Sequence, residues 1–175
     1  MLNSLKDDEH ALFVCEGTFE QVAITILKDA GVLVTPRENI IAITRLRKAA
    51  QVQDKYLNYD YDWPVAIVRI IDSRKEQFRL GNLYRDRFTV TNVYTRPEAE
   101  MLVIAREGCF TDYAKRKSKM KPSEYCVQVL GLSDVKSRPF LERYWNVDSL
   151  SAAAREYKRL QKLDKGEICL ADLLK

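Results

Sequence analysis

The sequence has few residues suited to metal or nucleophile chemistry. It contains one histidine, His10, and four cysteines without a Cys-x-x-Cys pair, a pattern that does not suit a zinc cluster. A single histidine also excludes Ser-His-Asp and Cys-His schemes unless His10 itself serves, and its acidic neighbours predict that it faces solvent. The cysteines are expected to be small buried thiols in a reducing compartment: Cys15, Cys109, Cys126 and Cys169.

The chain also lacks long apolar runs and a glycine-rich phosphate loop. No run approaches the roughly 20 apolar residues that cross a bilayer, and the first ten residues are acidic where a signal peptide is basic. We therefore expect a soluble cytoplasmic protein without a membrane partner. The single glycine after the first predicted strand, Gly17, argues against a nucleotide-binding flavodoxin-like protein.

The composition and the order of patterns indicate an α/β fold. The 175 residues are 46% hydrophobic and 31% charged, an ordinary globular mixture that suits one domain or one domain with a small appendage. Apolar runs predict strands at residues 11–15, 39–44, 65–72 and 86–95, and helical spacing predicts helices at residues 19–31, 45–60 and 96–108. This alternation predicts a mostly parallel, Rossmann-like central sheet of about four strands with flanking helices.

Strand signals stop after about residue 108. The remaining segments all predict helices or helical turns, including one at residues 167–175. We therefore expect an α/β core at residues 1–108 and a helical extension at residues 109–175 that packs on it as part of one compact unit.

Acidic residues follow two of the predicted strands. Glu16 closes the first strand and is followed by Gly17, and Asp72 closes the third. Ligands of parallel sheets bind beyond the carboxyl ends of the strands, so these carboxylates are expected to lie close together. Such acids often cap a helix or pair with arginine, but a charge that closes an apolar strand is costly unless something binds it. Carboxylate oxygens suit Mg²⁺ or Mn²⁺.

Two segments resemble a known family. Residues 12–27, LFVCEGTFEQVAITIL, are similar to the opening strand-Glu-Gly-helix of the topoisomerase–primase (TOPRIM) fold, and residues 65–74, VAIVRIIDSR, are similar to its later strand ending in Asp-x-Asp. The resemblance covers about residues 10–105. The family that shares this fold includes the overcoming-lysogenisation-defect nucleases of phage defence. It implies that Glu16 and Asp72 are catalytic ligands of Mg²⁺ or Mn²⁺ in phosphodiester chemistry.

The second aspartate of this motif is absent, and Arg74 stands in its place. At about 6 Å and an effective dielectric of about 20, this exchange beside a divalent ion changes the interaction by on the order of 10 kcal/mol. Either another acid, such as Glu76, Glu98 or Glu100, completes the site, with Glu76 as the candidate metal ligand and Glu98 as the candidate catalytic residue, or metal binding is weakened or lost. In the second case Arg74 pairs with Asp72 or Glu16.

Basic residues are clustered although the net charge is only +4. Residues 115–121, KRKSKMK, carry five positive charges, and a second group follows the second predicted strand. Such clusters favour contact with a polyanion, although a basic run is also an ordinary solvated face. The candidate nucleic-acid contacts are Arg45, Arg47, Lys48, Arg74, Arg96, Lys115, Arg116, Lys117, Lys119 and Lys121.

Two functions remain open from the sequence. The first is a TOPRIM-like nucleic-acid-associated protein with a degenerate metal site, a subunit of a phage-defence or DNA-processing complex with a separate ATPase or other protein partner. The second is an active Mg²⁺-dependent nuclease. We favour the first, because Arg74 lies two residues past Asp72 and therefore points to the same side of an extended chain.

Overall fold

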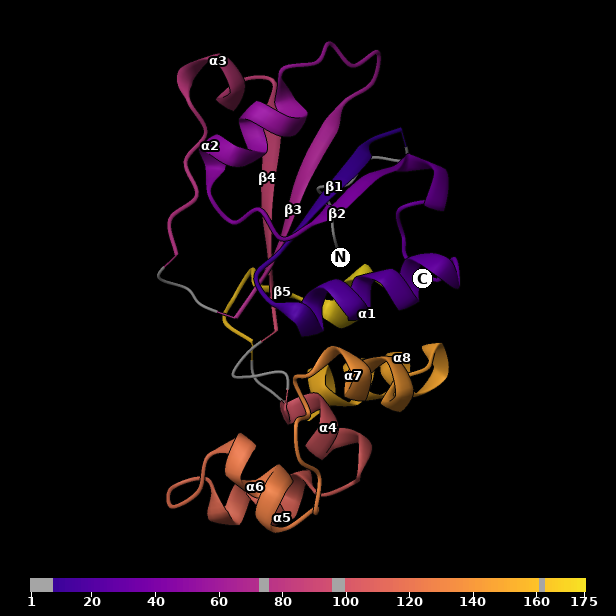
Figure 1. Ribbon diagram of the computed structural model, residues 1–175, viewed down its shortest axis with the longest axis vertical. Coiled ribbons are helices and arrows are strands. Elements are labelled where there is room, and N and C mark those ends of the chain that lie inside the picture. Colours follow the sequence, from indigo (N-terminus) through magenta and orange to yellow (C-terminus); the bar gives the residue numbers. More distant parts are fainter. Residues whose placement is uncertain (1–7, 73–75, 96–99, 161–162) are drawn as a thin grey trace.

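The computed structural model describes residues 8–72, 76–95, 100–160 and 163–175, and it has the predicted α/β fold (Figure 1). Five strands form one sheet in the order β2-β1-β3-β4-β5, and every neighbouring pair is parallel. The strands are β1 (His10–Cys15), β2 (Ile40–Thr44), β3 (Val65–Ile71), β4 (Phe88–Tyr94) and β5 (Ile168–Cys169).

The fifth strand corrects the expectation for the end of the chain. The helical turn predicted within residues 167–175 is present as a 3₁₀ turn, η3 (Leu170–Leu173), but the preceding Ile168 and Cys169 pair with β4 as a strand. Two strand residues are too few to show an alternating pattern, so the sequence gives no strand signal here. The Asp172 carboxylate accepts a hydrogen bond from the Cys169 amide at 2.9 Å and caps this short turn.

The helices largely follow the predicted pattern. They are α1 (Thr18–Asp29), α2 (Ala49–Val52), α3 (Asn82–Arg85), α4 (Glu100–Arg106), α5 (Phe110–Arg116), α6 (Pro122–Gln128), α7 (Arg138–Tyr144) and α8 (Val147–Leu160), with a 3₁₀ turn η1 (Arg37–Asn39) and a π turn η2 (Gln53–Leu57). The helix expected at residues 45–60 is shorter at both ends, so its basic start is a loop between β2 and α2.

Both faces of the sheet are covered, which explains why its strands are continuously apolar. Along β1, Phe13 and Cys15 belong to the cluster formed with α1, α4, α7 and α8, whereas Leu12 and Val14 belong to the cluster formed with α2 and η2. The first cluster includes apolar side chains from both sides of residue 108, and Phe19 of α1 meets Trp145 after α7 edge-to-face at 6.3 Å. The sheet and the C-terminal helices therefore share one core.

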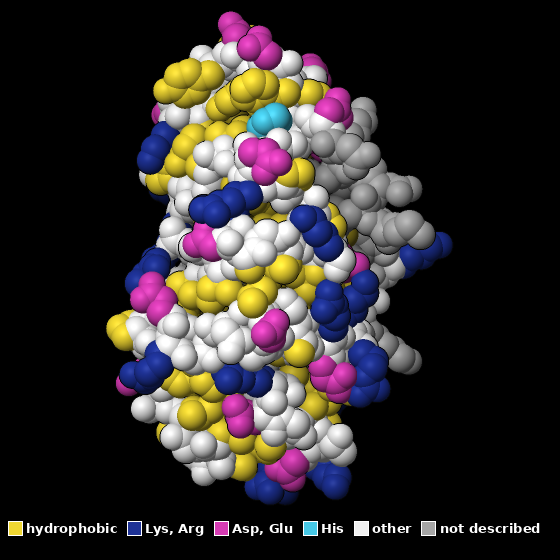
Figure 2. Space-filling model, turned by 90° about the vertical axis from the view of Figure 1, so that its right-hand side faces the viewer, with side chains coloured by type: hydrophobic (Ala, Val, Ile, Leu, Met, Phe, Trp, Pro, Cys, Tyr) yellow, Lys and Arg dark blue, Asp and Glu magenta, His cyan; other side chains and the backbone are white. Residues whose placement is uncertain are grey.

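The single histidine, expected to face solvent, is half-buried, and Figure 2 shows part of its side chain at the surface. His10 is the first residue of β1, its ring stacks on Trp63 with centroids 4.3 Å apart, and its buried Nδ1 has no hydrogen-bond partner. It starts the strand that Glu16 follows, so the two residues lie at opposite edges of the sheet.

The cysteine prediction is largely confirmed. All four thiols are free, and three of them are buried whereas Cys109 is half-buried. Among the described residues, no helix is both long enough and apolar enough to cross a membrane.

Candidate functional site

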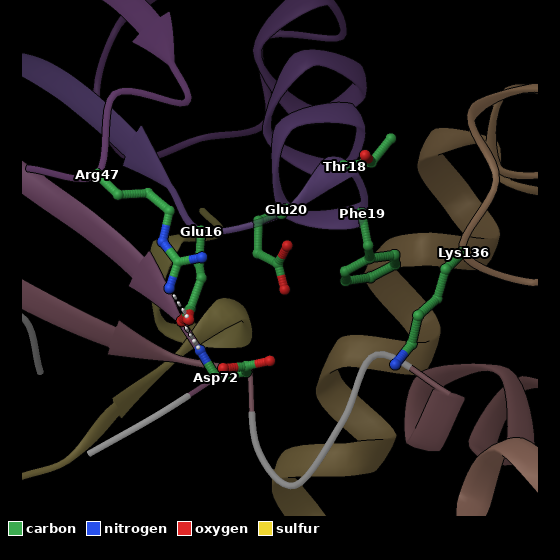
Figure 3. Close-up of a pocket in the computed structure, with 8 residues that line it drawn as sticks. Glu16, Thr18, Phe19, Glu20, Arg47, Asp72 and Lys136 are labelled. Carbon is green, nitrogen blue, oxygen red and sulfur yellow. Dashed lines mark hydrogen bonds and ion pairs between the residues drawn. The ribbon is translucent and has the colours of Figure 1, made fainter. Parts of the chain in front are cut away.

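The predicted proximity of Glu16 and Asp72 is confirmed. Their strands β1 and β3 are parallel neighbours, with Cys15 opposite Ile70. The Asp72 amide donates a hydrogen bond to Glu16 Oε2 at 2.9 Å, and both residues line a cleft of about 310 Å³ at the carboxyl edge of the sheet (Figure 3).

An arginine from the β2–α2 loop neutralises Glu16. Arg47 Nη2 donates to Glu16 Oε1 at 2.6 Å, so both carboxylate oxygens of Glu16 have protein partners. Burial raises the pKa of Glu16, and the Asp72 carboxylate adds to the rise, whereas the Asp72 amide and Arg47 oppose it. The sequence pointed to Arg74 for this role, but Arg74 lies outside the described residues.

Glu76 also contacts Arg47 but does not line the cleft. Its Oε1 is 3.1 Å from Arg47 Nη2, and its Oε2 accepts from Arg69 Nη2 at 2.8 Å. Arg69 is a residue of β3 and its side chain is only 2% exposed. Glu76 is therefore held between two guanidinium groups, which is not the position expected of a third metal ligand beside Asp72.

A third acid, Glu20, does line the cleft, and sequence reasoning missed it. It lies in the first turn of α1, is 6% exposed, and accepts a hydrogen bond from Thr95 Oγ1 at 3.2 Å. A Cβ on Gly17 would lie 2.7 Å from Glu20 Oε2, so the glycine leaves room for this carboxylate. The available signal was its place in the first turn of the helix that follows the first strand, since that turn lies at the carboxyl edge of the sheet.

Lys136 approaches the cleft from the C-terminal part of the chain and was also missed. It belongs to the loop between α6 and α7, and Figure 3 shows its amine across the cleft from Glu16. Lys136 Nζ is 2.9 Å from Oε1 of Glu100, a carboxylate only 2% exposed in α4. The contact joins segments 36 residues apart, and no local pattern in the sequence predicts it.

The other predicted contacts are spread over the surface. Arg45 and Lys48 are exposed on the loop that carries Arg47 but do not line the cleft. The basic run at residues 115–121 forms the end of α5 and the turn before α6, at the lower end of the molecule in Figure 1. Glu98 and Arg96, predicted as catalytic and nucleic-acid-binding, lie outside the described residues.

While Arg47 is in place, the described cleft leaves Glu16 poorly suited to bind a divalent metal ion. Glu16 is engaged by a cation and an amide, and Glu20 is buried against Thr95. Within residues 8–72, 76–95, 100–160 and 163–175, no group of three or more His, Cys, Asp or Glu side chains is arranged to hold a metal ion. Of the three acids that line the cleft, Glu16 is paired with a cation, Arg47, whereas Glu20 accepts a hydrogen bond from the neutral Thr95 hydroxyl.

Burial of Glu20 predicts a pH-dependent effect on stability. Burial raises its pKa above the ordinary value of 4.5, and the nearby Asp72 charge adds to the rise. The ionised form therefore costs stability once the pH exceeds the unfolded-state pKa. We expect Glu20→Gln, which keeps an oxygen acceptor for Thr95, to raise the melting temperature at pH 8, with a gain that shrinks below pH 4.5.

Thermal unfolding from pH 4 to pH 8 checks this, with Glu38→Gln in the exposed η1 turn as the control. A gain at pH 8 that is equally large at pH 4 would show that ionisation of Glu20 is not its cause.

A scan against protein-family models, a search of curated proteins and a search of solved structures each found no match to this chain. The functional assignment therefore rests on the fold and on the geometry of the cleft.

Proposed function

We propose that this chain is a TOPRIM-like nucleic-acid-associated protein whose carboxylate site is neutralised by arginine. The observation that carries the proposal is the ion pair of Arg47 with Glu16 at 2.6 Å, beside the hydrogen bond from Asp72. A positive guanidinium repels a divalent cation and takes up the carboxylate oxygen that such a cation needs. The chain then works as a cytoplasmic subunit of a phage-defence or DNA-processing complex, with a separate ATPase or other protein as its partner.

Exposed basic residues support nucleic acid as the ligand. Arg45 and Lys48 flank Arg47 beside the carboxyl edge, and the side chains of the 115–121 run face solvent apart from half-buried Met120. Phosphate contacts of this kind give binding without sequence preference, and the affinity falls steeply with salt.

A second candidate is the Mg²⁺- or Mn²⁺-dependent nuclease. The observation that favours it is that three carboxylates, Glu16, Glu20 and Asp72, line one cleft. The two candidates differ in what Arg47 does. In the first it permanently neutralises Glu16, and in the second it must leave before a metal binds.

Removal of Arg47 separates the two candidates. We expect wild-type protein to bind Mn²⁺ weakly and Arg47→Gln to bind it about tenfold more tightly, because loss of the ion pair frees Glu16 Oε1. The free Mn²⁺ signal in electron paramagnetic resonance measures the affinity, and Arg45→Gln is the matched control because Arg45 is exposed on the same loop and does not line the cleft.

A nuclease assay with Mn²⁺ completes the test. Tight Mn²⁺ binding and cleavage by wild-type protein, both lost in Glu16→Gln, would contradict the proposal and establish the nuclease instead.

A further inference from the structure

Glu76 occupies a place that suits an external anion. One of its carboxylate oxygens faces Arg47 at 3.1 Å and the other faces Arg69 at 2.8 Å. The two arginines come from the β2–α2 loop and from β3, whereas Glu76 belongs to the segment that follows β3. Paired guanidinium groups aimed at one carboxylate are also the arrangement that binds phosphate oxygens.

One donor of this arrangement is left over. Arg69 Nε is buried and has no hydrogen-bond partner, although a buried unpaired donor destabilises a folded protein. A carboxylate offers two oxygens, and Glu76 directs one to each arginine. A phosphate group offers at least three acceptor oxygens, so it can supply one for Arg69 Nε in addition to one for each of the two arginines.

We propose that Arg47 and Arg69 form a binding site for a phosphate oxyanion, and that Glu76 fills this site when the ligand is absent. The shared chemistry covers inorganic phosphate and the terminal phosphate of a nucleic acid. Only the second source rests on the proposed function.

The surroundings allow the exchange. The side chains of Arg47 and Glu76 are 49% and 23% exposed, so solvent reaches the outer side of their ion pair. Arg69 has other contacts that keep its guanidinium in place when Glu76 leaves: it donates to Asn92 Oδ1 at 3.2 Å and lies 4.6 Å from the centre of the Phe78 ring. The site is therefore preformed on one side and open on the other.

The test removes the internal competitor. Glu76→Gln is expected to bind inorganic phosphate at least tenfold more tightly than wild-type protein in isothermal titration calorimetry. The matched control is Glu142→Gln, since Glu142 is an exposed acid whose ion pair with Arg138 measures 3.0 Å. Equal phosphate affinities for wild type and Glu76→Gln would overturn the proposal.

A second measurement applies if Glu76→Gln is unstable. If phosphate binds only the folded state, the melting temperature of the protein rises as the phosphate concentration increases. Wild-type protein at millimolar phosphate should show a shift of the Arg69 Nε–H signal in nuclear magnetic resonance, and Arg47→Gln should reduce that shift. An Arg69 signal that phosphate leaves unchanged in wild type contradicts the site.

Oligonucleotides with and without a 5′-phosphate distinguish the two sources. Tighter binding of the phosphorylated strand to Glu76→Gln than to wild type identifies a nucleic-acid end as a ligand. Phosphate binding without any oligonucleotide binding leaves the anion site standing and removes the proposed function. Oligonucleotide binding with no gain in phosphate affinity in Glu76→Gln supports the proposed function and contradicts the anion site.

Discussion

Replacing the four lysines of the 115–121 run with glutamine is expected to weaken nucleic-acid binding by roughly 10³-fold at 0.1 M salt. Each phosphate contact contributes about 0.7–0.9 to the slope of log affinity against log salt, so four contacts contribute about 3. Arg116 is left unchanged because it is 3.0 Å from Asp112 and already paired. Fluorescence anisotropy with a labelled oligonucleotide between 50 and 200 mM salt measures both quantities. The replaced residues are Lys115, Lys117, Lys119 and Lys121.

A pair of double variants controls for net charge. Lys117→Gln/Lys119→Gln removes two charges from the run, and Lys55→Gln/Lys165→Gln removes two exposed charges elsewhere. If the run contacts phosphates, only the first double variant lowers the salt slope. An equal change in both would mean that the run is an ordinary solvated face and that net charge alone acts.

The carboxyl edge of the sheet could be predicted because its signals are local. An acid directly after each apolar run places Glu16 and Asp72 at strand ends, and the parallel pairing of these two strands brings the acids together. The identity of the cation that neutralises Glu16 depends on how the segments after β1, β2 and β3 meet in space. Arg47 follows β2, which is the other neighbour of β1, so its contact with Glu16 follows from strand order that the sequence does not specify.

Buried charges were the main source of missed residues. Arg69 sits within a strand that is otherwise apolar, and only the packing of Glu76, Asn92 and Phe78 around it explains a charge that is 2% exposed. Glu20 occupies a position in α1 that a polar residue usually exposes. The partner of Arg69 is Glu76, which follows the end of β3, and the hydrogen-bond donor to Glu20 is Thr95, 75 residues away. A local sequence pattern therefore does not predict that either charged residue is buried.

Lys136→Met is expected to lower the free energy of unfolding by about 2–3 kcal/mol, because it leaves the Glu100 carboxylate buried without its cation. Lys136 Nζ is 2.9 Å from Glu100 Oε1, and Glu100 Oε2 is already buried without a hydrogen-bond partner. The lysine itself is 59% exposed, so solvent compensates part of the loss and the upper range for fully buried pairs does not apply. Urea unfolding followed by circular dichroism measures the difference.

Glu100→Gln tests whether the buried charge is the cause. In the double variant Glu100→Gln/Lys136→Met the side-chain amide at position 100 is neutral and needs no cation, so most of the lost stability should return. The control for loss of a surface charge is Lys165→Met, at an exposed lysine. A double variant that is as unstable as the sum of the single variants would show that the two side chains act independently. Recovery would mean that Lys136 stands at the cleft because the α4 carboxylate holds it there, which makes the C-terminal part of the chain necessary for one wall of the site.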